Sequence, residues 1–167
     1  NRDGTLAWAR RAGGTASDVG RGVAANPDGS AVVTGYFAGT ASFGGTSLQT
    51  AGTYDMFLVR YYADGTLAWA KQAGGTGITD LEGYGVAAFS DGSAVVTGQL
   101  KGTASFGAGE TNATVLTSNG TAEPDMFIAR YSPANYRMLE IKPEDLKGNG
   151  TFAAKVDYAT GNHPDID

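Results

Sequence analysis

DGTLAWARRAGG occupies residues 3–14 and DGTLAWAKQAGG occupies residues 64–75, and ten of the twelve positions are identical. A twelve-residue segment that occurs twice in 167 residues indicates an internal repeat. An internal repeat is a stronger guide to the architecture than any single motif. Each copy begins with an Asp-Gly pair, a turn signal because glycine supplies the positive φ that a tight turn needs. The Leu-Ala-Trp-Ala segment next to it alternates large and small side chains. The line therefore predicts a turn and then a β-strand.

The repetition extends well beyond this line. GVAANPDGSAVVTGYFAGTASFG at residues 22–44 returns as GVAAFSDGSAVVTGQLKGTASFG at residues 85–107, and DMFLVRY at residues 55–61 returns as DMFIARY at residues 125–131. The second copy is longer because of a polar, turn-rich stretch at residues 109–123. We expect that stretch to be a surface loop, where insertions are tolerated.

Within each copy the sequence indicates about four antiparallel strands and no helix. Asp-Gly pairs at residues 28–29 and 91–92 predict further hairpin turns. The β-branched run AVVTGYF and the alternating run DMFLVRYY, residues 55–62, predict strands, and no segment shows a helical period. We expect an all-β fold with two four-stranded antiparallel units, at residues 22–72 and 85–142. The outer strand of the second unit is expected in YRMLEIK, residues 136–142.

Strands are left over at both ends of this arrangement. Residues 5–12 hold an outer-type strand with no unit before it, and residues 151–160 hold a spare strand in the divergent tail, residues 143–167. Unpaired strand edges recruit other chains, and subunits can donate strands to one another. We therefore predict assembly with neighbouring subunits through these terminal strands. The side chains assigned to this contact are Leu6, Trp8, Phe152, Val156 and Tyr158.

The repeated motifs D-G-T-L-x-W-A, D-G-S-A-V-V-T-G, G-T-A-S-F-G and D-M-F-[LI]-[VA]-R-Y resemble the bacterial β-propeller repeat, often called the seven-bladed β-propeller repeat. The resemblance covers residues 3–131, about three quarters of the chain. It implies that each unit is a propeller-like blade of an extracellular or cell-surface protein, and it implies no chemistry. In the tail, GNGTFAAKVDYATG is weakly similar to the FG-GAP repeat but lacks that repeat's Asp-x-Asp-x-Asp-Gly calcium loop.

Two blades cannot close a ring, because closed propellers have about four to eight. Three arrangements stay open: part of a longer propeller, a ring completed by several copies, or an open polymer joined end to end. We expect the third, a non-enzymatic structural subunit of a surface filament or matrix whose partner is itself. The alternative is a carbohydrate-binding, lectin-like module formed by oligomeric completion of a ring, with glycans as its ligands.

The composition points away from catalysis. The chain has no cysteine and a single histidine, His163, so it cannot build a thiolate or His-rich zinc site. It shows no phosphate-loop or dinucleotide fingerprint. A net charge of −5 with scattered cations disfavours nucleic acid, and no apolar run has the length of a membrane span. We predict no catalytic residue and no cofactor, and we leave calcium open only at Asp165 and Asp167.

Acidic residues recur at matching places in the two copies. Asp55 and Asp125 start the DMF strands, and Asp18 and Asp80 are expected in equivalent loops. Paired acids serve as acid and base in glycosidases. Acids repeated at the same position more simply accept hydrogen bonds from the backbone at turns and strand starts. We therefore expect structural roles for them, and we expect the two tryptophans to pack between repeats rather than to stack on sugars.

Overall fold

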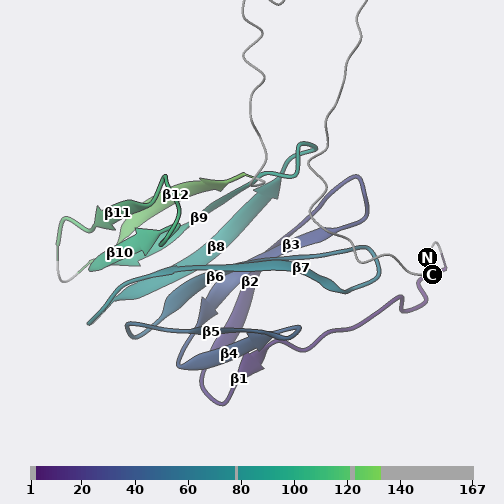
Figure 1. The fold of residues 1–167 in the computed structure, drawn as a ribbon, viewed down its shortest axis with the longest axis horizontal. Helices are drawn as coiled ribbons and strands as arrows, with labels where there is room; N and C mark the ends of the chain where they lie inside the picture. Colours follow the sequence, from purple (N-terminus) through teal and green to yellow (C-terminus); the bar gives the residue numbers. More distant parts are fainter. Residues whose placement is uncertain (1–2, 78, 121–122, 133–167) are drawn as a thin grey trace, which may run out of the picture. The chain divides into compact units, whose positions relative to one another are not determined.

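The computed structural model describes residues 3–77, 79–120 and 123–132. In this part of the chain every regular element is a β-strand, and the strands form three antiparallel sheets of three, six and three strands (Figure 1). The all-β expectation is therefore confirmed. Outside the described residues lie the expected strands at 136–142 and 151–160, the side chains Phe152, Val156 and Tyr158, and the calcium candidates Asp165 and Asp167.

The two sequence copies fold into related runs of strands, called here the first repeat (residues 18–74) and the second repeat (residues 80–131). The first repeat contains β2 (Asp18–Ala25), β3 (Ala31–Phe37), β6 (Asp55–Tyr61) and β7 (Leu67–Gly74), hydrogen-bonded in the order β7-β6-β3-β2. The second contains β8 (Asp80–Ala88), β9 (Ala94–Lys101) and β12 (Asp125–Tyr131), in the order β12-β9-β8. Within the described residues, the second repeat thus matches the first without its fourth strand.

Each repeat also carries a hairpin that the expectation of about four strands did not contain. These hairpins are β4 (Thr40–Phe43) with β5 (Thr46–Gln49), and β10 (Thr103–Phe106) with β11 (Thr114–Thr117). Part of the expected 109–123 loop is therefore strand β11. Each hairpin pairs with the end of the outer strand that precedes its repeat: β1 (Gly13–Gly14) pairs with β4, and β7 pairs with β10. The repeats are consequently joined by hydrogen bonds as well as by packing.

Residues 5–12 form no strand, which differs from the expectation. Regular pairing begins only at β1, where Gly13 lies opposite Ser42. In the first repeat the matching strand, β7, is hydrogen-bonded along its length to β6. Among the described residues nothing offers residues 5–12 such an edge. A strand sequence without a paired edge has no ladder to complete, which accounts for the difference.

The predicted Asp-Gly turns are confirmed. Gly29, Gly65 and Gly92 have φ values of +81°, +81° and +80°, which favour glycine because it lacks a Cβ atom. In the first of these turns, the Asp28 carboxylate accepts a hydrogen bond from the Ser30 amide at 2.9 Å. The side chains of Asp64 and Asp91 accept equivalent bonds from the amides two residues ahead. The same hydrogen bond from a backbone amide to the Asp side chain therefore stabilises each of these Asp-Gly turns.

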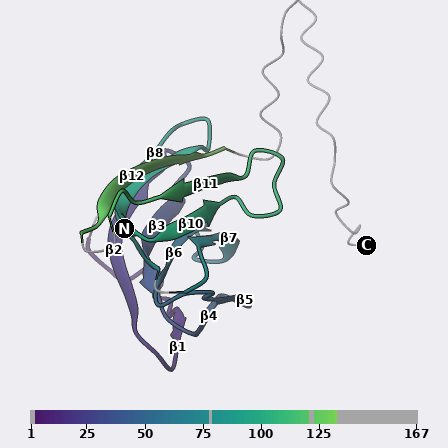
Figure 2. The same ribbon diagram turned by 90° about the vertical axis from the view of Figure 1, so that its left-hand side faces the viewer.

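Two apolar clusters form the core of the described residues. The two faces of each repeat pack against different neighbours. One face, the trailing face, turns toward the next repeat, and in the first repeat it is buried where β8 packs on β2 and β3 (Figures 1 and 2). The opposite face, the leading face, turns toward the preceding outer strand. The trailing face of the first repeat presents Val32, Met56 and Leu58. The leading faces present the matching pairs Phe37/Leu100, Phe43/Phe106, Phe57/Phe127, Val59/Ala129 and Tyr61/Tyr131.

Candidate functional site

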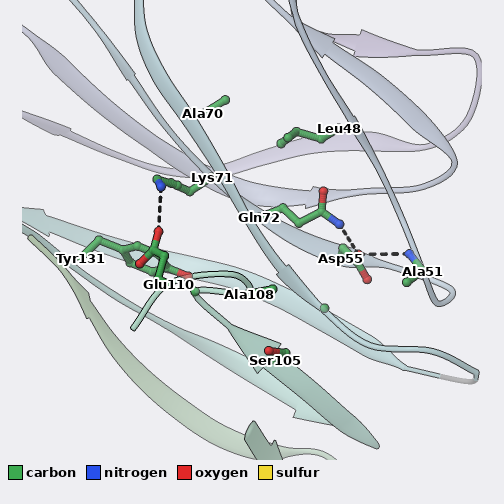
Figure 3. A pocket seen from close by; sticks show the side chains of 12 residues that line it. Leu48, Ala51, Asp55, Ala70, Lys71, Gln72, Ser105, Ala108, Glu110 and Tyr131 are labelled. Atoms are coloured by element: carbon green, nitrogen blue, oxygen red, sulfur yellow. Dashed lines mark hydrogen bonds and ion pairs between the residues drawn. The ribbon is translucent and has the colours of Figure 1, made fainter. Parts of the chain in front are cut away.

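A pocket with a volume of about 380 Å³ lies at the junction between the repeats (Figure 3). Asp55 at the start of β6 and Gln72 on β7 line it from the first repeat. Glu110, in the turn between β10 and β11, and Tyr131 on β12 line it from the second. Polar side chains from both repeats line the pocket together with apolar ones such as Leu48 and Ala108.

Asp55 is fully buried and anchors the first-repeat side of this pocket. Its Oδ2 atom accepts hydrogen bonds from the Ala51 amide at 3.2 Å and from Gln72 Nε2 at 2.8 Å. Burial raises the pKa of Asp55, and these two hydrogen bonds oppose that shift because they stabilise the carboxylate. A Cβ atom at Gly74 would overlap the Asp55 carboxyl group, so the strand needs glycine there. The carboxylate therefore ties β7 to the loop before β6.

The second-repeat side of the pocket contains an ion pair and a tyrosine. Lys71 Nζ and Glu110 Oε1 lie 2.7 Å apart, which links β7 to the β10–β11 turn. Burial raises the pKa of Tyr131 to about 12, and the nearby Glu110 carboxylate adds to the shift. The Tyr131 hydroxyl is buried and makes no hydrogen bond within the described residues. On this side of the pocket it is therefore the group that a bound polar ligand would satisfy.

The pocket recurs, in a smaller form, at the preceding junction. A cavity of about 220 Å³ is lined there by Arg10, Arg11 and Tyr61, which match Lys71, Gln72 and Tyr131 in the repeat. A feature present once per junction is typical of a structural joint. In the part of the chain that the structure describes, no three His, Cys, Asp or Glu side chains gather as a metal site. The geometry thus offers hydrogen bonding and packing.

The DMF-strand aspartates play the structural role expected of them. The Asp125 carboxylate accepts a hydrogen bond from the Asn119 amide at 2.8 Å, as Asp55 does from Ala51. Each acid therefore fixes the loop that leads into its strand.

The expected equivalence of Asp18 and Asp80 is wrong. Asp18 lies opposite Phe37 and Leu81 lies opposite Leu100, so Asp18 matches Leu81. Both acids also lie in strands rather than in loops. The correct offset here is 63 residues, the same as between the hairpin turns, and not the 62 residues that separate the two acids.

Of the side chains assigned to assembly, the structure describes Leu6 and Trp8. Leu6 is 78% exposed. Trp8 is half-buried: its Nε1 atom donates to the Ala63 carbonyl at 3.0 Å, and its ring lies 6.2 Å from that of Tyr61. Trp8 therefore packs on the leading face of its own first repeat, as Trp69 packs on that of the second. The Trp8 side chain is used within the chain, whereas residues 6–12 belong to no β-ladder among the described residues.

An exposed apolar surface on the second repeat was not found by sequence reasoning. Met126 is 77% and Ile128 65% exposed, although their equivalents Met56 and Leu58 are fully buried. These side chains, with Val95, form the trailing face of the second repeat. The signal in the sequence was the repetition itself, because DMFLVRY and DMFIARY predict the same apolar face. In the described structure, only the face of the first repeat has a further repeat packed on it.

Comparison with known proteins finds no match, either among protein-family models or among curated proteins. The resemblance to the bacterial β-propeller repeat therefore stays a prediction from the repeated motifs. Within the described residues, no helix is long and apolar enough to cross a membrane.

Proposed function

We propose that this chain is a non-enzymatic, extracellular structural repeat protein that assembles with copies of itself through its terminal strands, as a subunit of a filament or matrix. One observation carries the proposal. The same apolar face is fully buried in the first repeat and exposed at Met126 and Ile128 in the second. A contiguous exposed apolar surface marks an interaction site. In the first repeat this face is covered by the next repeat, so a repeat from another copy is the kind of surface that would cover it in the second.

The strand edges support the same conclusion. Among the described residues β12 pairs only with β9, so its other edge is open. In the first repeat the equivalent edge of β6 is filled by β7. An open strand edge is a template for pairing with another chain. On this proposal the four-stranded runs are propeller-like blades, two of which are too few to close a ring within one chain.

The native mass of the purified full-length chain tests the proposal. We expect light scattering to show a mass that rises with protein concentration, and negative-stain microscopy to show elongated particles, because a head-to-tail contact repeats without limit unless it closes. A monodisperse monomer at all concentrations up to the millimolar range would contradict self-assembly.

A carbohydrate-binding module is the second candidate, and the pocket is the observation that favours it. The buried Tyr131 hydroxyl lacks a partner among the described residues, and the Lys71–Glu110 pair also lines this pocket, so hydroxyl-rich ligands would find donors and acceptors there. Small closed rings that bind glycans through these pockets, in place of elongated particles, would replace the filament proposal with this one. Isothermal titration with oligosaccharides, comparing the wild type with Lys71→Ala, distinguishes the two.

A further inference from the structure

We propose that residues 6–12 of one copy add to the open edge of β12 in another copy, in the register that β7 keeps with β6 and in the place that the sequence prediction gives to residues 136–142 of the same chain. The first repeat of the incoming copy would then lie on the trailing face of the second repeat. This inference rests on the proposed function, because it specifies which surfaces make the contact. Its occupant is a second copy of this chain.

The internal joint shows the geometry of this contact. β7 belongs to the line DGTLAWAKQAGG, which residues 3–14 repeat at ten of twelve positions, and β6 and β12 are identical at five of seven. In the chain, Met56 lies opposite Ala73, Leu58 opposite Lys71, and Val59 opposite Ala70. The same register between copies places residues in these pairs: Met126 with Ala12, Phe127 with Arg11, Ile128 with Arg10, and Ala129 with Ala9.

The contacts of residues 5–12 within their own chain do not occupy the edge that the proposal uses. Trp8 donates to the Ala63 carbonyl, and Arg10 Nε donates to the Gly65 carbonyl at 2.8 Å. Both bonds come from side chains and fix this segment to its own first repeat. β7 makes both kinds of contact at once, because Trp69 packs on the second repeat while the backbone of β7 pairs with β6. Residues 6–12 are therefore held in place by side-chain bonds, and among the described residues they belong to no β-ladder.

Charge complementarity favours the pairing between copies. At the internal joint, Gln72 Nε2 donates to the Asp55 carboxylate at 2.8 Å. The equivalent residues at the proposed contact are Arg11 and Asp125. The proposed pairing thus replaces a neutral donor by a guanidinium opposite a carboxylate, and charge-assisted bonds of this kind are about twice as strong as neutral ones. Arg11 is exposed in the described structure, and Asp125 is half-buried.

The packing of the two faces fits as well. At the internal joint, β8 approaches so closely that a Cβ atom at Gly83 would overlap the Thr34 hydroxyl and lie 3.0 Å from Met56. The incoming copy would present Gly20, the equivalent of Gly83, to the equivalent pair on the second repeat. A Cβ atom at Gly20 meets only Val33, at 4.0 Å, so this glycine needs no close approach within its own chain. A glycine at this position would, however, allow the close approach of another copy, as Gly83 does at the internal joint.

One position makes the copy–copy contact weaker than the internal joint. Asp18 stands where the second repeat has the fully buried Leu81. Its carboxylate already accepts a hydrogen bond from the Gly14 amide at 2.7 Å. Placing a carboxylate in an apolar slot carries a desolvation cost that a leucine avoids. We therefore expect reversible, concentration-dependent assembly.

Cysteine pairs test the register, because the chain has no native cysteine. Two full-length variants, Ala9→Cys and Ala129→Cys, are mixed under mild oxidation, so that a heterologous disulfide joins two different chains. We expect this pair to cross-link at least tenfold faster than the mismatched pair Ala12→Cys with Ala129→Cys. Equal rates for the two pairs, in chains that still assemble, would overturn the inference.

The charge test uses two variants of Arg11. We expect Arg11→Glu to weaken assembly about tenfold or more, because it places a second carboxylate opposite Asp125. Arg11→Gln, which copies Gln72, should stay within about threefold of the wild type. Arg11→Gln is the matched control, because it removes the charge at the same position and keeps a hydrogen-bond donor there. A loss of assembly for Arg11→Glu that is no larger than for Arg11→Gln would also overturn the inference. A wild type that never assembles would refute the proposed function itself, whereas assembly without the matched cross-link refutes only this contact.

Discussion

Leu58→Ala is expected to lower the free energy of unfolding by about 2–5 kcal/mol, whereas Ile128→Ala should change it by less than about 0.5 kcal/mol in the monomer. The two residues occupy the same position of the repeat. Leu58 is fully buried beneath the second repeat, and Ile128 is largely exposed. Truncating the buried side chain removes its transfer free energy and leaves a cavity, whereas truncating the exposed one leaves none.

Urea denaturation at a concentration where the chain is monomeric measures both values. The same variants then separate stability from assembly, because Ile128→Ala removes apolar area from the proposed contact and should weaken assembly without loosening the fold. Similar unfolding costs at the two positions would mean that the second repeat's trailing face is already covered within the chain, and would contradict the proposed contact.

Gly83→Ala should lower stability by about 1–3 kcal/mol or more, whereas Gly20→Ala should leave it unchanged or raise it by up to about 1 kcal/mol. The methyl group at position 83 would meet Thr34, a fully buried residue whose hydroxyl donates to the Phe57 carbonyl at 2.9 Å. This neighbour cannot move aside without breaking a hydrogen bond. The methyl group at position 20 enters open space, and alanine restricts the unfolded chain more than glycine does.

The glycine pair also reports on assembly. Thermal unfolding measures the stability difference, and light scattering of Gly20→Ala measures the effect on association. If copies meet as the repeats do, Gly20→Ala leaves a stable protein that no longer assembles. Normal assembly of this variant would show that β2 does not approach another copy closely.

Much of the fold is encoded in local signals. The Asp-Gly turns and the run AVVTGYF predict β3 with the bounds that the structure shows, and the run DMFLVRYY predicts β6 to within one residue. A positive φ and a period of two are properties of a few adjacent residues. The inserted hairpins were missed, since their strands are only four residues long and β4 and β10 each lie between two glycines. The signal was present in β4, where buried Ala41 and Phe43 alternate with exposed neighbours.

The candidate contact surfaces were less accessible to sequence reasoning. Leu58 and Ile128 stand in nearly identical strands, so no local pattern distinguishes the buried residue from the exposed one. The difference arises from the strands that pack on each trailing face, and those are set by the tertiary arrangement. Residues 5–12 illustrate the converse, because a sequence that forms β7 when β6 lies beside it forms no strand where the described residues supply no partner edge.

Methionine oxidation during assembly tests the central claim most directly, namely that a second copy takes the place of a further repeat. Met126 and Met56 occupy the same repeat position, one largely exposed and the other fully buried. Brief peroxide treatment and then peptide mass spectrometry give the oxidation rate of each. We expect Met126 to oxidise quickly in dilute protein and to become protected, like Met56, as the concentration rises into the assembling range. An oxidation rate of Met126 that stays high in assembled protein would contradict this claim.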